Sequence, residues 1–282
     1  MVIDVHVHPE GYEPVYDEEL TPKRKLAMGR YITRSAPMKL VFAQMNYDKI
    51  DKSVLLPLDL TTQCGFRVLE NEDIKKLVDM YPDRFIGFAS VDPYREDVAA
   101  VLDHAFGDLG LSGLKLNPSR QKFYPDDPMM KVVYDKCVEY NKPIMFHSGT
   151  SWEPDTPAKY SQPLCFEEVA IEYPKLRMCL AHFGWPWVQD TTMMILKYPN
   201  VWADTAMLYM DRPKDFFNQI FKVDLSPLWI ENCINKKVLF GSNCPRFGPG
   251  DMREGIELLG LREKTTKDIL GNNALDFLGM EG

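Results

Sequence analysis

The chain of 282 residues is 45% hydrophobic and 26% charged, a composition that excludes a disordered protein. Its 33 Lys and Arg residues against 41 Asp and Glu residues give a formal net charge of −8, which argues against nucleic acid or an anionic membrane as the main partner. No run approaches the roughly 18 consecutive apolar residues of a membrane-spanning helix. Residues 1–10 lack the basic region and long apolar run of a signal peptide.

The six cysteines form no CxxC pair and are too sparse for a disulfide scaffold. Reduced thiols are typical of the cytoplasm, and we therefore expect a cytoplasmic protein.

Short apolar, β-branched runs alternate with longer helical patterns along the chain. Eight runs are predicted as strands: 2–6, 53–57, 85–90, 113–116, 143–147, 177–181, 201–204 and 237–241. Nine segments are predicted as helices: 38–49, 70–81, 95–107, 128–141, 164–173, 187–198, 214–234, 251–259 and 265–278. Residues 11–37 are predicted as a long loop or partial helix, and residues 150–162 as a second long loop.

Strands that alternate with helices indicate parallel βαβ units. The length allows two small domains or one α/β barrel of about 250 residues. Eight units favour the barrel, and no glycine-rich loop follows the first predicted strand to support a dinucleotide-binding fold. We therefore predict one α/β domain over residues 1–282 with the (β/α)8 TIM-barrel architecture.

Four of the five histidines fall at or just past the carboxyl end of a predicted strand: His6, His8, His147 and His182. In a (β/α)8 barrel that rim carries the active site. Imidazole suits zinc, iron, manganese or cobalt. The pattern therefore predicts a metal site at the rim, whereas His104, in the middle of a predicted helix, is expected to be an ordinary helix residue.

The spacing of the first two histidines predicts their orientation. His6 and His8 are two residues apart on an extended segment and should point to the same face. Strict alternation then turns Asp4 toward the barrel interior, with Val5 and Val7 toward the helices.

Further polar and aromatic side chains follow other predicted strands. Lys115 and Asn117 share one face at the fourth strand and are candidates for binding an anionic substrate. Arg120 and Arg246 follow the fourth and eighth strands, and each is either a clamp for a carboxylate or a solvated loop charge. Trp152 either walls an aromatic pocket or packs as plain core.

The end of the seventh predicted strand offers one more acidic group. Asp204 is either the partner that orients a histidine or buried polar support without a catalytic role.

Six motifs in this order resemble the amidohydrolase superfamily over nearly the whole chain. They are DVHVH at 4–8, GLKLNP at 113–118, FHSG at 146–149, LAHFG at 180–184, FGSNCP at 240–245 and GNNA at 271–274. The similarity is to the amidohydrolase-related branch, which holds aminocarboxymuconate-semialdehyde decarboxylase, γ-resorcylate decarboxylase and many uncharacterised hydrolases.

The resemblance implies one divalent metal ion, zinc or manganese, held by His6, His8 and His147. It implies a role in catalysis or near the metal for His182. It also implies an aspartate, as metal ligand and proton carrier, at the position of Asn243. For Lys115 it adds the alternative of a carbamate that bridges two metals, as in other branches.

Two residues depart from the family pattern. Asn243 can bind a metal through its carbonyl oxygen, but an amide carries no titratable proton and no negative charge. The amide is either a deliberate Asp-to-Asn change or natural to this subgroup, whose activity is then altered or absent. Asn117 stands where relatives often have histidine.

Three functions follow from these residues. The first is a metal-dependent hydrolase of a small carboxylate-bearing ester, lactone or amide, in which metal-activated water is the nucleophile and His182 assists. The second is a non-oxidative decarboxylase or hydratase of an unsaturated or aromatic acid. The third is a catalytically silent barrel, which only Asn243 supports. We expect a small anionic substrate and allow for a homodimer.

Overall fold

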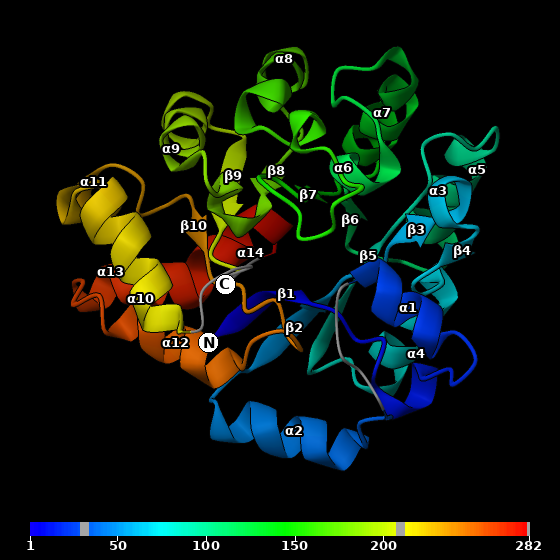
Figure 1. Cartoon of the computed structure of the whole chain (residues 1–282), viewed down its shortest axis with the longest axis horizontal. Coiled ribbons are helices and arrows are strands. Elements are labelled where there is room, and N and C mark those ends of the chain that lie inside the picture. The colour runs from blue at the N-terminus through cyan, green and yellow to red at the C-terminus, as the bar shows by residue number, and fades with distance from the viewer. Residues whose placement is uncertain (29–33, 207–211, 281–282) are drawn as a thin grey trace.

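The computed structural model describes residues 1–28, 34–206 and 212–280. Eight parallel strands form one sheet in chain order (Figure 1). They are β1 (Ile3–Val7), β2 (Lys52–Leu55), β5 (Phe85–Ala89), β6 (Gly113–Leu116), β7 (Ile144–Phe146), β8 (Met178–Leu180), β9 (Val201–Asp204) and β10 (Val238–Leu239). The eight predicted strands are confirmed within two residues at each end.

The sheet closes on itself between its last and first strands. The backbone N–H of Val5 donates to the carbonyl of Phe240 at 2.9 Å, and that of His8 donates to the carbonyl of Cys244 at 2.8 Å. These bonds return the β10 segment to β1 and confirm the predicted (β/α)8 barrel.

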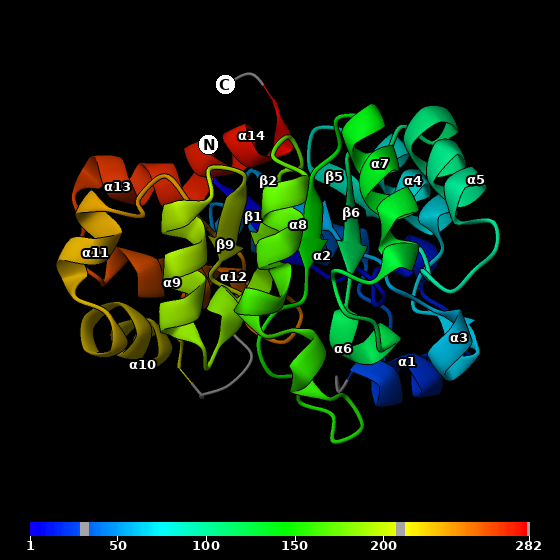
Figure 2. The same cartoon turned by 90° about the horizontal axis from the view of Figure 1, so that it is seen from above.

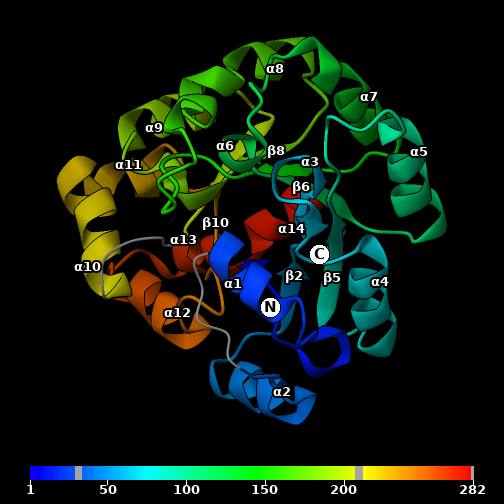
Figure 3. The same ribbon diagram turned by 45° about the vertical axis from the view of Figure 1, so that its right-hand side comes forward.

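The helices lie around the strands (Figures 1 and 3). They are α1 (Thr21–Met28), α2 (Met38–Tyr47), α3 (Thr61–Cys64), α4 (Asn71–Met80), α5 (Val98–Asp103), α6 (Pro118–Gln121), α7 (Lys131–Glu139), α8 (Glu167–Glu172), α9 (Val188–Lys197), α10 (Pro213–Asn218), α11 (Pro227–Asn232), α12 (Pro249–Glu257), α13 (Glu263–Lys267) and α14 (Asn273–Leu278). Across the described ranges, each helix falls short of the length and apolarity needed to cross a bilayer.

The structure differs from the sequence prediction at several segments. The helix predicted over 214–234 is interrupted, because Ser226 precedes Pro227 and its side chain caps the start of α11. Within residues 11–37, α1 forms, which agrees with the predicted alternative of a partial helix. A short antiparallel hairpin of β3 (Asp59–Leu60) and β4 (Phe66–Arg67) was not predicted, because two-residue strands carry no readable periodicity. Residues 29–33 of the first loop lie outside the described residues.

A β-bulge breaks the alternation of β1. Between Asp4 and Val7 the chain advances three residues while β2 advances two, from Ser53 to Leu55. Val5 consequently packs in the buried interior cluster, whereas Val7 packs in the outer cluster beneath the helices. The expectation that Val5 faces the helices and Asp4 the interior was wrong, and Asp4 instead accepts hydrogen bonds from Ser242.

The end of the barrel opposite α1, α3 and α6 is closed by α14 (Figure 2). The ring of Phe277 lies 6.5 Å from that of Phe88 on β5 and 5.8 Å from that of Trp202 on β9. These two strands are not neighbours in the sheet, so Phe277 spans the interior and seals it with apolar surface.

The substitution Phe277→Ala should lower the free energy of unfolding by about 3–5 kcal/mol, because it leaves a cavity in the floor of the barrel. Denaturant unfolding measures the change. Met280→Ala, at a 43% exposed position just beyond the same helix, is the control and should have little effect. Equal stability of the two variants would contradict the role of Phe277 as a seal.

Candidate active site

One pocket at the carboxyl ends of the strands gathers every residue predicted from the sequence for the site. It has about 450 Å³ of empty space, including its open mouth. The predicted residues that line it are His6, His8, Lys115, Asn117, Arg120, His147, Trp152, His182, Asn243 and Arg246. They come from five different strand ends, β1, β6, β7, β8 and β10, which is the arrangement that the barrel rim provides.

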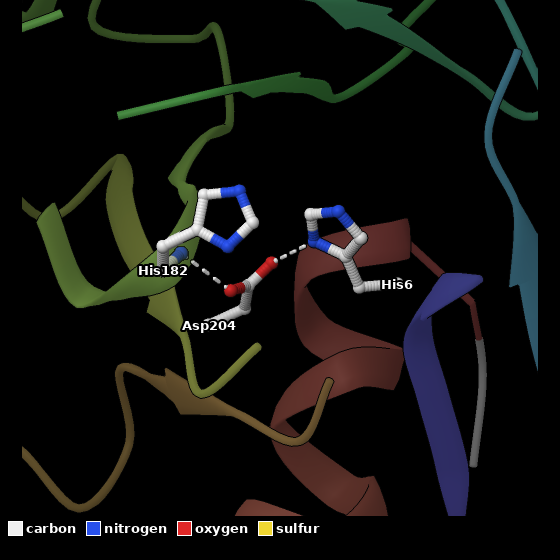
Figure 4. A group of neighbouring side chains, drawn as sticks. All are labelled: His6, His182 and Asp204. Atoms are coloured by element: carbon white, nitrogen blue, oxygen red, sulfur yellow. Dashed lines mark hydrogen bonds and ion pairs between the residues drawn. The ribbon is translucent and has the colours of Figure 1, made fainter. Parts of the chain in front are cut away.

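Asp204 at the end of β9 holds His6 and His182 in place (Figure 4). The Nδ1 of His6 donates to Asp204 Oδ2 at 2.7 Å. The other carboxylate oxygen accepts the backbone N–H groups of His182 at 2.7 Å and Ala206 at 3.0 Å. Of the two alternatives for Asp204, the partner that orients a histidine is confirmed.

The two histidines of β1 place their Nε2 atoms close together. His8 Nδ1 donates to the carbonyl of Leu56 at 3.2 Å, so each ring is oriented through Nδ1. The Nε2 atoms of His6 and His8 lie 3.2 Å apart. Two nitrogen ligands at 2.0–2.1 Å from a tetrahedral ion are roughly 3.3 Å apart, so this spacing fits one shared metal ion.

The other two histidines complete the cluster. The ring of His182 lies between those of His6 and His147, with centroid distances of 4.8 Å and 4.7 Å. His182 Nδ1 donates to the carbonyl of Ala206 at 2.8 Å. Burial lowers the pKa of His147 and of His182 well below the usual value, and for His147 the charge of Lys115 adds to this. The lowered pKa favours the neutral form of both imidazoles, which is the state that binds metals.

One group of histidine and carboxylate ligand atoms close enough to hold a metal ion differs from the predicted metal set. It consists of His6, His182 and Asp204, whose ligand atoms all lie within 4.8 Å of one another. Both oxygens of Asp204 already accept hydrogen bonds, as described above. Asp204 is thus placed to orient the histidines. Its role is compatible with a metal ion held by other histidine nitrogens on the pocket side.

Backbone conformation at two strand ends is unusual. His182 and Asn243 have φ values of +62° and +61°, in the left-handed region. Asparagine tolerates this region better than most residues. Asn243 is buried, lines the pocket, and donates its backbone N–H to the carbonyl of His6 at 2.9 Å.

The cationic residues are held within the pocket wall. Lys115 and Arg120 are only 3% and 9% exposed, so a solvated loop charge is the wrong description of Arg120. Arg120 forms an ion pair with Glu153. Asn117 accepts the backbone N–H of Arg120 at 3.1 Å and caps α6.

Three residues of the pocket were not identified from the sequence. Ser151 and Glu153 lie in the second long loop, beside Trp152, and Leu58 precedes the unpredicted hairpin. Nothing in a loop of irregular sequence indicates which side chains turn inward. Trp152 is 62% exposed at the edge of the pocket, so the alternative of plain core packing is wrong.

The loops after β7 and β8 approach each other closely. A Cβ atom at Gly149 would lie 2.2 Å from the carbonyl oxygen of Trp185, and the φ of Gly149 is +83°. Only glycine fits this contact. It brings His147 and His182, at the ends of those strands, to one side of the pocket.

Comparison with known proteins agrees with this geometry. The chain matches the amidohydrolase family over residues 3–280. It is 24% identical over 246 residues to the 2-amino-3-carboxymuconate-6-semialdehyde decarboxylase of Dictyostelium discoideum, a match that covers 75% of this chain and 66% of that protein. The chain thus spans just under two thirds of that relative.

Two solved structures share the fold over almost the entire chain. An uncharacterised TIM-barrel protein of Bordetella bronchiseptica has a TM-score of 0.77 at 19% identity, covering 99% of this chain and 98% of that one. The 5-carboxyvanillate decarboxylase of Novosphingobium aromaticivorans, with bound manganese and 3-methoxy-4-hydroxy-5-nitrobenzoic acid, has a TM-score of 0.66 at 16% identity, covering 99% and 97%.

The family match spans the whole barrel, and the histidines of its strand ends meet in one pocket. This chain is a TIM-barrel enzyme of the amidohydrolase superfamily.

Proposed function

We propose that this enzyme is a metal-dependent carboxy-lyase that decarboxylates a small aromatic or unsaturated carboxylate. The observation that carries the proposal is the pocket itself, in which the histidine cluster faces Lys115, Arg120 and Arg246. The decarboxylase relatives support the same reaction class. Among the functions expected from the sequence, decarboxylation thus replaces hydrolysis as the first choice.

The chain's own residues fit a divalent metal ion. In the proposal His6, His8 and His147 hold zinc or manganese, with Asn243 beside them. The 3.2 Å spacing of the two Nε2 atoms and the neutral state of His147 support this assignment. When bound, the ion supplies positive charge that orients the oxygen atoms of a substrate.

The cationic side chains would bind the carboxylate. Arginine pairs with a carboxylate through two parallel hydrogen bonds, and lysine adds a point charge. Lys115, Arg120 and Arg246 line the pocket together with the histidines. Because Lys115 and Arg120 are shielded from water, their attraction for an anion is stronger than at an exposed surface.

Decarboxylation leaves an electron pair on carbon, and a proton must reach that carbon. Asn243 has no titratable proton to supply. His182 lines the same pocket, and its Nδ1 is engaged by the carbonyl of Ala206. Its Nε2 is therefore the atom that would take up a proton from water and deliver it to the carbon from which CO2 has left.

Hydrolysis is the second candidate, because the same histidines and cations would hold a carboxylate-bearing ester, lactone or amide. To separate the two, the zinc- or manganese-loaded enzyme is incubated with hydroxybenzoates, unsaturated dicarboxylates, and carboxylate-bearing esters, lactones and amides. We expect CO2 release from an acid and no ring or ester opening. Ester, lactone or amide cleavage without CO2 would favour hydrolysis. No turnover by either this protein or its Asn243→Asp variant would favour the silent barrel.

His6→Ala should strip the metal ion while the fold persists, because it removes one ligand and the contact to Asp204. Elemental analysis of the purified protein measures metal content, and circular dichroism checks the fold. His104→Ala is the matched control, since His104 is a 48% exposed helix residue far from the rim, and its metal content should not change. Full metal occupancy in His6→Ala would refute the assignment.

Asn243→Asp should raise turnover by at least about 10²-fold, because general acid–base groups contribute about 10²–10⁴-fold. The carboxylate should also tighten metal binding by adding a charged oxygen ligand. Steady-state kinetics and metal titration of the two proteins test both effects. If the aspartate variant is no faster, His182 carries the proton without help from this position.

A further inference from the structure

The loop after β7 touches the active site at three successive residues. Ser151 Oγ is hydrogen-bonded to His147 Nε2 at 3.0 Å, Trp152 lines the pocket edge, and Glu153 forms the ion pair with Arg120. One short segment thus connects a proposed metal ligand to a proposed substrate anchor.

The base of this loop is held firmly. Ser161, fully buried, accepts the backbone N–H of Gly149 at 2.7 Å through its carbonyl and donates its hydroxyl to the carbonyl of Gly149 at 2.6 Å. The backbone N–H of Thr150 donates to the carbonyl of Trp185 at 2.8 Å. Between these anchors the tip carries exposed Trp152 and Asp155.

The ion pair at the tip is mostly shielded from water, with Arg120 9% and Glu153 14% exposed. If Arg120 lost this partner without gaining another, its buried charge would be unpaired, and the folded state would be less stable. A substrate carboxylate has the same chemistry as the Glu153 side chain. Both carboxylates at the one guanidinium would repel each other, so binding through Arg120 requires an exchange.

We propose that Glu153 is an internal competitor that occupies the carboxylate position at Arg120 until a substrate carboxylate replaces it. The inference rests on the carboxylate substrate proposed above. Exchange of one carboxylate for another preserves the ion pair of Arg120, and the exposed tip of the loop can release Glu153 to water. A neutral analogue has no carboxylate to pair with Arg120, so the competition with Glu153 concerns carboxylates alone.

The test measures binding, not turnover. Calorimetric titration of the metal-loaded protein with benzoate should give at least about tenfold tighter binding for Glu153→Gln, since the internal competitor is gone. Asp155→Asn removes the same charge from an exposed position of the same loop and should leave the affinity for benzoate nearly unchanged. Benzamide, the neutral analogue, should not gain affinity in either variant.

A second substitution separates competition from a general loss of negative charge. Arg120→Gln should weaken benzoate binding, and adding Glu153→Gln to it should no longer improve the affinity. Equal or weaker benzoate binding by Glu153→Gln, including no detectable binding, would overturn the inference and indicate that Glu153 merely positions Arg120.

The binding test of Glu153 and the CO2-release test of the proposed decarboxylase can fail separately. A protein that releases CO2 while Glu153→Gln gains no affinity refutes the inference alone. A protein that gains affinity in Glu153→Gln but releases no CO2 from any acid keeps the inference and refutes the proposed decarboxylase.

Discussion

The buried hydrogen bond between His6 and Asp204 is the interaction on which the arrangement of the active site depends. It joins the first barrel strand to the seventh across the intervening β10 segment. Gly241 makes this reach possible, because a Cβ there would lie 3.0 Å from the Cβ of His6. The second oxygen of Asp204 fixes the backbone of His182. One carboxylate therefore holds the ring of His6 and the backbone of His182, and the Nε2 atom of His6 turns toward His8 as a consequence.

The barrel interior divides into an apolar floor and a polar rim. Below the histidines, side chains such as Met145, Cys179 and Trp202 pack against Phe277 and keep water out. Burial is accordingly the largest cause of the low pKa of His147 and His182. The floor thus does more than stabilise the fold, because the burial that it provides lowers the pKa of both imidazoles and favours their neutral form.

Irregular backbone concentrates at the functional rim. The bulge in β1 and the left-handed conformations of His182 and Asn243 all lie at strand ends that line the pocket. Regular strand geometry would point alternate side chains away from the pocket. With the bulge, Val5 joins the interior cluster while His6 and His8 still reach the same site. Departures from regular geometry are therefore part of how the site is assembled.

The residues themselves revealed the barrel and ten of the thirteen residues that line its pocket, because alternating strands and helices place every strand end at one rim. His6 and His8 could be paired from their spacing alone, and Lys115 could be placed by its strand. Tertiary contacts decided the rest. The role of Asp204 depends on a partner 198 positions away. The bulge depends on the register with β2, and Glu153 enters the pocket only because Arg120 lies opposite an irregular loop. Local patterns describe what a segment can form, whereas such partners are chosen only when distant segments pack together.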